Sequence, residues 1–151
     1  MALRPVLQFP DKRLTIVAKP IEAIGDEIRQ LAQDMCEVMY DEPGIGLAAT
    51  QVGEAVRLIV VDTEWKEENH ERNPLILVNP ELSEHEGEVL WKEGCLSVPD
   101  FEAEVKRAER VLLRAIEVFA ASTRRTSQDR RATIRVFKNR LRALRARRRS
   151  L

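Results

Sequence analysis

Apolar residues recur at helical spacing in residues 26–40. The apolar positions in this segment are mostly three or four residues apart: Ile28, Leu31, Met35, Val38 and Met39. Residues with this spacing share one face of an α-helix. Asp26 suits the positive end of the helix dipole, and Pro43 marks the end of the segment. We therefore expect an amphipathic helix over 26–40, with Cys36 as a small core residue beside its apolar face.

Strand patterns follow the predicted helix. Residues 56–61 and 75–78 are rich in β-branched and aliphatic side chains, which favour strands, and a polar connection joins them. Weaker patterns predict strands at 88–91 and 102–105. Residues 111–120 are apolar but repeat with a period of neither 2 nor 3.6 residues.

The composition changes near residue 111. Residues 1–110 carry 12 Lys and Arg against 23 Asp and Glu, whereas residues 111–151 carry 13 against 2. Every glycine, proline, histidine, cysteine and tryptophan lies in the first segment. The formal net charge of +0 therefore hides an acidic segment followed by a basic one. From Arg135 onward, abundant arginine with a thin apolar edge predicts a basic helix.

The compartment follows from what the sequence lacks. At 151 residues the chain fits one domain, and no apolar run approaches the ~20 residues that a membrane-spanning helix needs. The first residues have no apolar core with a small-residue cleavage site, so they do not resemble a signal peptide. Without a secretory marker, Cys36 and Cys95 are expected as reduced thiols. These features predict a cytoplasmic protein with no membrane segment.

The first candidate site is motif one, residues 44–53, with the sequence Gly-Ile-Gly-Leu-Ala-Ala-Thr-Gln-Val-Gly. Gly44 and Gly46 let the backbone approach a ligand closely or adopt a positive φ, and Gln51 offers an amide donor. The same composition also fits a tight turn that leads into a strand. The segment lacks the G-x-G-x-x-G spacing of a nucleotide-binding loop.

The second candidate site is motif two, residues 93–99, with the sequence Glu-Gly-Cys-Leu-Ser-Val-Pro. Cys95 follows a glycine in a polar setting, as a thiolate nucleophile or a metal ligand would. A nucleophilic cysteine needs a nearby base, and the histidines of the chain are His70 and His85. A single cysteine also fits buried packing, so the residues alone leave these interpretations open.

Together, the two motifs, their order and their separation of about 40 residues resemble peptide deformylases. Further matches are Phe9-Pro10-Asp11, Ala18-Lys19-Pro20 and Asn79-Pro80-Glu81. The resemblance covers about residues 5–115. It implies an α+β, peptide-deformylase-like domain over residues 1–115, followed by a divergent basic tail, helical or disordered, over residues 116–151. The implied reaction is hydrolytic removal of the formyl group from the N-terminal formyl-methionine of nascent polypeptides.

The resemblance also implies the roles of individual residues. In the family a metal, ferrous iron in many members and zinc or nickel in others, is held by the motif-two cysteine and by both histidines of a His-Glu-x-x-His helix. Carried onto this chain, Cys95 is the metal ligand and Gln51 a side-chain donor to the developing oxyanion. The backbone N–H of Leu96 is the second donor, and Gly46 approaches the substrate backbone.

The chain departs from this pattern because no His-Glu-x-x-His occurs in its 151 residues. His70 and His85 are each followed by glutamate, but neither has a histidine four residues on, and both precede Cys95. A single thiolate does not hold a catalytic metal. We therefore expect the central metal-binding helix to be missing or replaced, and an impaired or inactive deformylase. Alternatively, His85 is recruited as a metal ligand.

Two accounts explain residues 116–151. A shifted reading frame of GC-rich DNA would encode such arginine-rich, glycine-free sequence, or a rearrangement could have removed the metal-binding helix. An alternative function follows from the charge: a non-catalytic scaffold whose basic tail, residues 124–149, contacts the ribosome or RNA. Such binding would weaken steeply with salt.

Overall fold

The computed structural model describes residues 4–66, 68, 71–118, 130–137 and 140–143. In chain order the elements are the 3-10 helix η1 (Lys12–Thr15), α1 (Asp26–Asp41), β1 (Gly46–Ala48), the 3-10 helix η2 (Ala49–Val52), β2 (Leu58–Val61), β3 (Leu75–Glu86), β4 (Val89–Cys95), β5 (Val98–Arg107), β6 (Arg110–Val118), β7 (Arg130–Phe137) and β8 (Arg140–Ala143). The protein is α+β, as expected. Within the described residues α1 is the one α-helix, and no helix there is long and apolar enough to cross a membrane.

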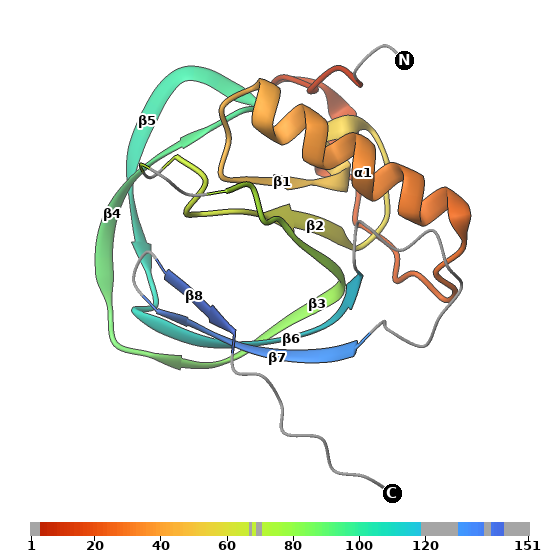
Figure 1. Cartoon of the computed structure of the whole chain (residues 1–151). Coiled ribbons are helices and arrows are strands. Elements are labelled where there is room, and N and C mark those ends of the chain that lie inside the picture. Colours follow the sequence, from red (N-terminus) through yellow and green to blue (C-terminus); the bar gives the residue numbers. More distant parts are fainter. Residues whose placement is uncertain (1–3, 67, 69–70, 119–129, 138–139, 144–151) are drawn as a thin grey trace, which may run out of the picture.

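The strands form two antiparallel sheets. Six of them pair in the order β1-β2-β3-β6-β7-β8, and β4 pairs with β5 in a second sheet. Figure 1 shows α1 lying across the β1–β2 end of the large sheet, while β4 and β5 arch away from the other strands. Because β1 is an edge strand of the large sheet, one side of its backbone has no strand partner in that sheet.

The core lies between α1 and the sheet. The helix predicted over 26–40 is confirmed, and it buries one apolar face: Leu31, Ala32, Met35, Cys36, Val38 and Met39. This face packs against buried side chains of the first strands: Leu47, Leu58, Val60, Ile76 and Val78. Met35 and Met39 are 0% exposed, so truncating either to alanine would cost about 2–5 kcal/mol of stability.

The strand predictions at 56–61 and 75–78 are confirmed by β2 and β3, although β3 continues to Glu86. The weaker patterns at 88–91 and 102–105 lie within β4 and β5. The apolar segment without a period is β6, whose buried residues do not alternate strictly with exposed ones.

The basic helix predicted from Arg135 onward is wrong over 135–137 and 140–143, which belong to β7 and β8. β7 pairs with β6 from Glu117↔Arg130 to Arg110↔Phe137. Its β-branched residues favour a strand, and this pairing decides the conformation. The boundary expected at residue 115, between the deformylase-like domain and the basic tail, falls within β6, which shares a sheet with β7. The remaining residues of the predicted 124–149 contact segment lie outside the described residues.

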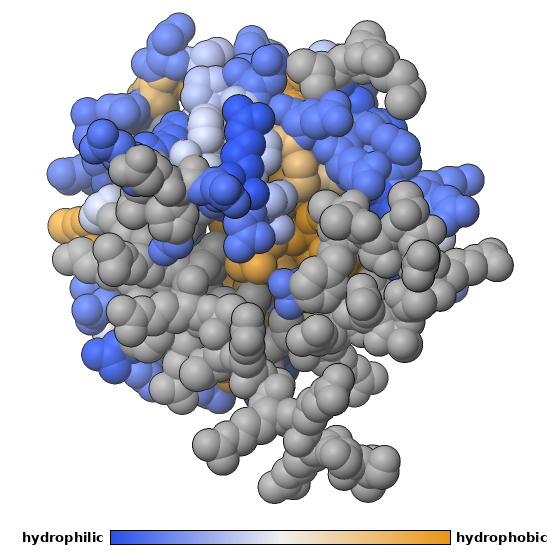
Figure 2. Space-filling view, viewed as in Figure 1, coloured by the Kyte–Doolittle hydropathy of each residue, from blue (hydrophilic) through white to orange (hydrophobic). Residues whose placement is uncertain are grey.

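The β4–β5 sheet is mostly exposed to solvent. Its large exposed side chains are Leu90, Trp91, Val98 and Phe101. Ion pairs connect the two strands, as between Lys92 and Glu102 at 2.5 Å. On the face seen in Figure 2, hydrophilic residues cover most of the described surface and hydrophobic ones gather near its centre. The β4–β5 sheet therefore contributes little to the core, although it carries motif two.

Candidate functional site

Motif one begins where α1 ends. The backbone N–H of Gly44 donates to the carbonyl of Met39 at 2.8 Å, so the helix leads directly into the motif. A Cβ added to Gly44 would lie 2.8 Å from Cδ1 of Leu96, which is closer than a carbon–carbon contact allows. A side chain at position 44 would therefore make the end of the Leu96 side chain shift. This contact places the two motifs side by side.

The short helix η2 fixes the side-chain amide of Gln51. Its Oε1 accepts a hydrogen bond of 3.0 Å from the backbone N–H of Ala48. Its Nε2 donates to Oγ of Ser97 at 3.1 Å and lies 3.9 Å from Sγ of Cys95. Gly53 ends η2 in a left-handed conformation with φ +86, which glycine adopts without strain. Because the amide oxygen is held inside motif one, the amide N–H groups point toward motif two.

Motif two supplies the facing residues. Cys95 is the last residue of β4, and its thiol is exposed. Leu96 packs against the core, and Ser97 is buried at 4% exposure, where it accepts the bond from Gln51. A cavity of about 670 Å³ opens at Cys95 and Leu96 and is also lined by Gln8 and Phe101. Its volume lies in the range of sites that bind small molecules and short peptides.

A bidentate ion pair stabilises the strands that carry motif two. Arg107 Nε donates to Glu93 Oε1 at 3.0 Å, and Arg107 Nη2 to Glu93 Oε2 at 2.7 Å. The hydrogen bonds from Arg107 hold the pKa of Glu93 below its ordinary value. The ion pair links β5 to β4 at Glu93, two residues before Cys95. Arg107 pairs with Val89 across the strands, and its side chain reaches along the sheet to Glu93, a contact that no local sequence pattern indicates.

The loop after β2 braces the start of motif one. The carboxylate of Asp62, at 6% exposure, accepts a hydrogen bond of 2.7 Å from the hydroxyl of Tyr40. The Asp62 backbone N–H donates to the carbonyl of Ile45 at 3.0 Å. The indole of Trp65 donates to the carbonyl of Gly44 at 2.8 Å. Burial, followed by the hydrogen bond with Asp62, raises the pKa of Tyr40.

The structure brings together three of the four predicted site residues, Gln51, Cys95 and Leu96. The fourth, Gly46, lies in the edge strand β1 at the start of the same motif. The sequence did not indicate a role for Ser97, although this residue lies inside motif two. It also did not indicate Tyr40, Asp62 and Trp65, because no local pattern distinguishes them. His85 lies on the exposed end of β3, in a different sheet from Cys95, and His70 is outside the described residues.

A family model described as polypeptide deformylase matches residues 3–135. The chain belongs to the peptide deformylase family. The match extends beyond residue 115 and into β7. The peptide deformylase of Alkalilimnicola ehrlichii is 50% identical over 117 residues, which make up 78% of this chain and 64% of that protein. The chain therefore spans just under two-thirds of the length of this relative.

Solved peptide deformylases share the fold. The crystal structure of the Legionella pneumophila peptide deformylase is 40% identical with a TM-score of 0.70, covering 77% of this chain and 66% of that one. A Met-Ala-Ser-bound class I type b peptide deformylase from Acinetobacter baumannii is 33% identical with a TM-score of 0.68, covering 77% of each chain. These similarities confirm the peptide-deformylase-like α+β fold.

Peptide deformylases are metalloenzymes, and Cys95 occupies the position of the motif-two cysteine. Among the described residues, no group of three or more His, Cys, Asp or Glu side chains could hold a metal ion. The side-chain nitrogen near the thiol is the amide of Gln51, which is a hydrogen-bond donor and not a metal ligand. The described residues therefore do not fit the metal site of the family.

Proposed function

We propose that this chain is a peptide deformylase homologue that binds N-formyl-methionyl peptides between its two motifs and is impaired or inactive in hydrolysing them. The observation that carries the proposal is the orientation of Gln51. Its amide oxygen is held by Ala48, and its nitrogen faces Ser97 at 3.1 Å and Cys95 at 3.9 Å. The donor is thus preorganised at the exposed thiol.

Binding of the formyl group uses donors from both motifs. The Gln51 amide carries two N–H groups, of which one bonds Ser97 and the other is directed toward Cys95. A formyl oxygen above Cys95 would accept from this second N–H and from the backbone N–H of Leu96. The peptide backbone would add to the open edge of β1 at Gly46, as extended ligands add to sheet edges.

The described residues of the site give little support for hydrolysis. The family reaction uses ferrous iron, zinc or nickel, and Cys95 is the one family ligand that this sequence retains. The described residues gather no set of metal ligands around it. The family relationship makes the chain a hydrolase homologue in protein biosynthesis, while the residues around Cys95 favour ligand binding without efficient turnover. We also propose a cytoplasmic location, on the basis of the free thiols of Cys36 and Cys95.

Calorimetry with N-formyl-Met-Ala-Ser tests the binding, and formate release with added Fe²⁺, Zn²⁺ or Ni²⁺ tests the chemistry. We expect binding that Gln51→Ala weakens about tenfold, because a hydrogen-bond donor to the formyl oxygen is lost. Gln33→Ala, at an exposed position of α1, serves as the matched control. Metal-dependent formate release at a rate typical of enzymes, or binding that Gln51→Ala leaves unchanged, would overturn the respective half of the proposal.

The second candidate function is contact with the ribosome or RNA through residues 124–149. Its specific support is the charge of residues 111–151, with 13 Lys and Arg against 2 Asp and Glu. A filter-binding titration against RNA at rising salt tests it, with a chain that ends after Val118 as control. Affinity that is equal in both chains would remove this candidate.

A further inference from the structure

Residues 4–9, here called the N-terminal strap, run past both motifs. The backbone N–H of Leu7 donates to the carbonyl of Gln51 at 2.7 Å, and that of Phe9 donates to the carbonyl of Ser97 at 2.8 Å. The strap therefore joins the backbone of the proposed oxyanion donor to the backbone of motif two. Leu7 is buried, which fixes the strap against the core.

Gln8 stands between these two hydrogen-bonded residues. Its side chain is exposed and lines the cavity that opens at Cys95. The backbone on both sides of Gln8 is fixed, so its side chain is presented from a defined point of the cavity wall. A glutamine amide both donates and accepts hydrogen bonds, which matches the N–H and C=O of a peptide unit.

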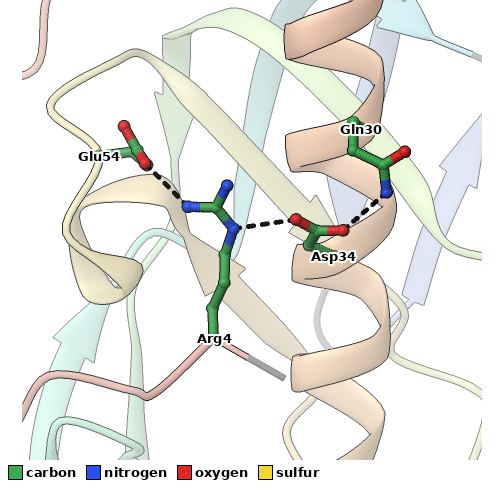
Figure 3. Close-up of polar contacts among 4 residues, drawn as sticks. All are labelled: Arg4, Gln30, Asp34 and Glu54. Atoms are coloured by element: carbon green, nitrogen blue, oxygen red, sulfur yellow. Dashed lines mark hydrogen bonds and ion pairs between the residues drawn. The ribbon is translucent and has the colours of Figure 1, made fainter. Parts of the chain in front are cut away.

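Arg4 anchors the start of the strap (Figure 3). Its Nε donates to Asp34 Oδ2 at 2.9 Å, and its Nη1 donates to Glu54 Oε1 at 2.8 Å. Asp34 is held in turn by Gln30, at 2.8 Å on the same helix. One guanidinium thus connects the strap to α1 and to the residue that follows motif one.

We propose that Gln8 contacts the bound peptide beyond its formyl-methionyl residue, and that Arg4 is a positioning residue that holds Gln8 in place. The inference rests on the proposed function. The cavity extends from Cys95 to Phe101 of β5 and includes Gln8 but not Gln51. In this proposal the first residue of the peptide pairs with the β1 edge at Gly46, and the residues after it enter the cavity and lie along the wall that contains Gln8.

Comparing a longer and a shorter ligand distinguishes a direct contact at Gln8 from a general effect on the structure. Calorimetry is carried out on the full chain with N-formyl-Met-Ala-Ser and with N-formyl-methionine, which ends before the proposed contact. We expect Gln8→Ala to weaken binding of the tripeptide about fivefold and to leave the affinity for N-formyl-methionine unchanged. Arg4→Ala should show the same selectivity, with faster hydrogen exchange at the amides of Leu7 and Phe9.

Arg13→Ala is the matched control, because Arg13 pairs with Asp11 on an exposed turn of the same N-terminal region. It should change neither affinity. Glu54→Gln removes only one of the two anchoring ion pairs and replaces Arg4→Ala if that variant fails to fold.

The outcomes separate the two proposals. Wild-type affinity of Gln8→Ala for the tripeptide, or equal losses for both ligands, would overturn the inference and leave the proposed function standing. Wild-type protein that binds neither ligand would overturn both.

Discussion

The indole nitrogen of Trp65 and the carbonyl oxygen of Gly44 are joined by a hydrogen bond of 2.8 Å. This bond fixes the loop after β2 to the first residue of motif one. Gly44 in turn lies against Leu96 of motif two. Trp65 therefore supports the site from outside it, and the contact can be removed without touching a residue that faces the ligand.

Trp65→Phe should lower the free energy of unfolding by about 1 kcal/mol, because the carbonyl of Gly44 loses its partner while the aromatic ring remains. Urea denaturation measures the change. Trp91→Phe, in the exposed β4–β5 sheet at 38% exposure, is the control and should stay within about 0.5 kcal/mol of wild type. Equal losses in both variants would mean that the hydrogen bond to Gly44 contributes nothing specific.

Gly44→Ala should destabilise the protein by no more than about 1 kcal/mol, because the new methyl group overlaps only the end of the Leu96 side chain, which can shift. If that overlap is the cause, Leu96→Ala in the same chain should cost less than the sum of the two single changes. Gly25→Ala is the control, since a Cβ there meets nothing within 4 Å. Strictly additive losses in the double variant would contradict the contact.

The two thiols should differ in reactivity. Cys95 is exposed and Cys36 is buried in the face of α1 that packs on the sheet. A thiol reagent added to the native protein should therefore modify one cysteine quickly, and Cys95→Ser should remove that fast phase. The second thiol should react only when urea unfolds the chain. Two fast phases in the native protein would show that α1 is not packed as described.

Stability should fall at alkaline pH. Burial, with added repulsion from Asp62 and Glu37, raises the pKa of the Cys36 thiol from 9.0 to about 12. Above pH 9 the unfolded chain loses this proton while the folded protein keeps it, so rising pH favours unfolding. The loss is on the order of 1 kcal/mol per pH unit. The fall in the urea midpoint between pH 8 and 10.5 should be smaller in Cys36→Ala, with a remainder from Tyr40, whose pKa burial also raises. An undiminished fall in that variant would assign the effect elsewhere.

The sequence predicted those parts of the fold whose pattern is local. The helix over 26–40 follows from its apolar spacing, and Gln51 and Cys95 follow from motifs a few residues long. The arginine-rich neighbourhood of Arg135, taken alone, predicts a helix. The structure places it in β7, where the strand is decided by pairing with Leu112 of β6.

Contacts between distant segments are the part that the sequence did not provide. Arg4 and Asp34 are 30 residues apart, and Leu7 meets Gln51 across a still longer stretch of the chain. No periodicity connects such positions, since only the packed helix and sheet bring them together. In the sequence Asp62 is a polar residue after a predicted strand. Only the folded structure shows that it is buried beside Tyr40.

The hydrogen bond from the Ala48 N–H to the Gln51 amide oxygen joins residues three apart, and both lie within motif one. Four consecutive residues therefore favour this direction of the donor, which the bond to Ser97 of motif two then completes. Grafting residues 44–53 between a helix and a strand of an unrelated protein should carry the orientation of this amide along. A motif of this kind can keep its shape through changes elsewhere in the chain, and so it can mark the family even where the rest of the sequence diverges.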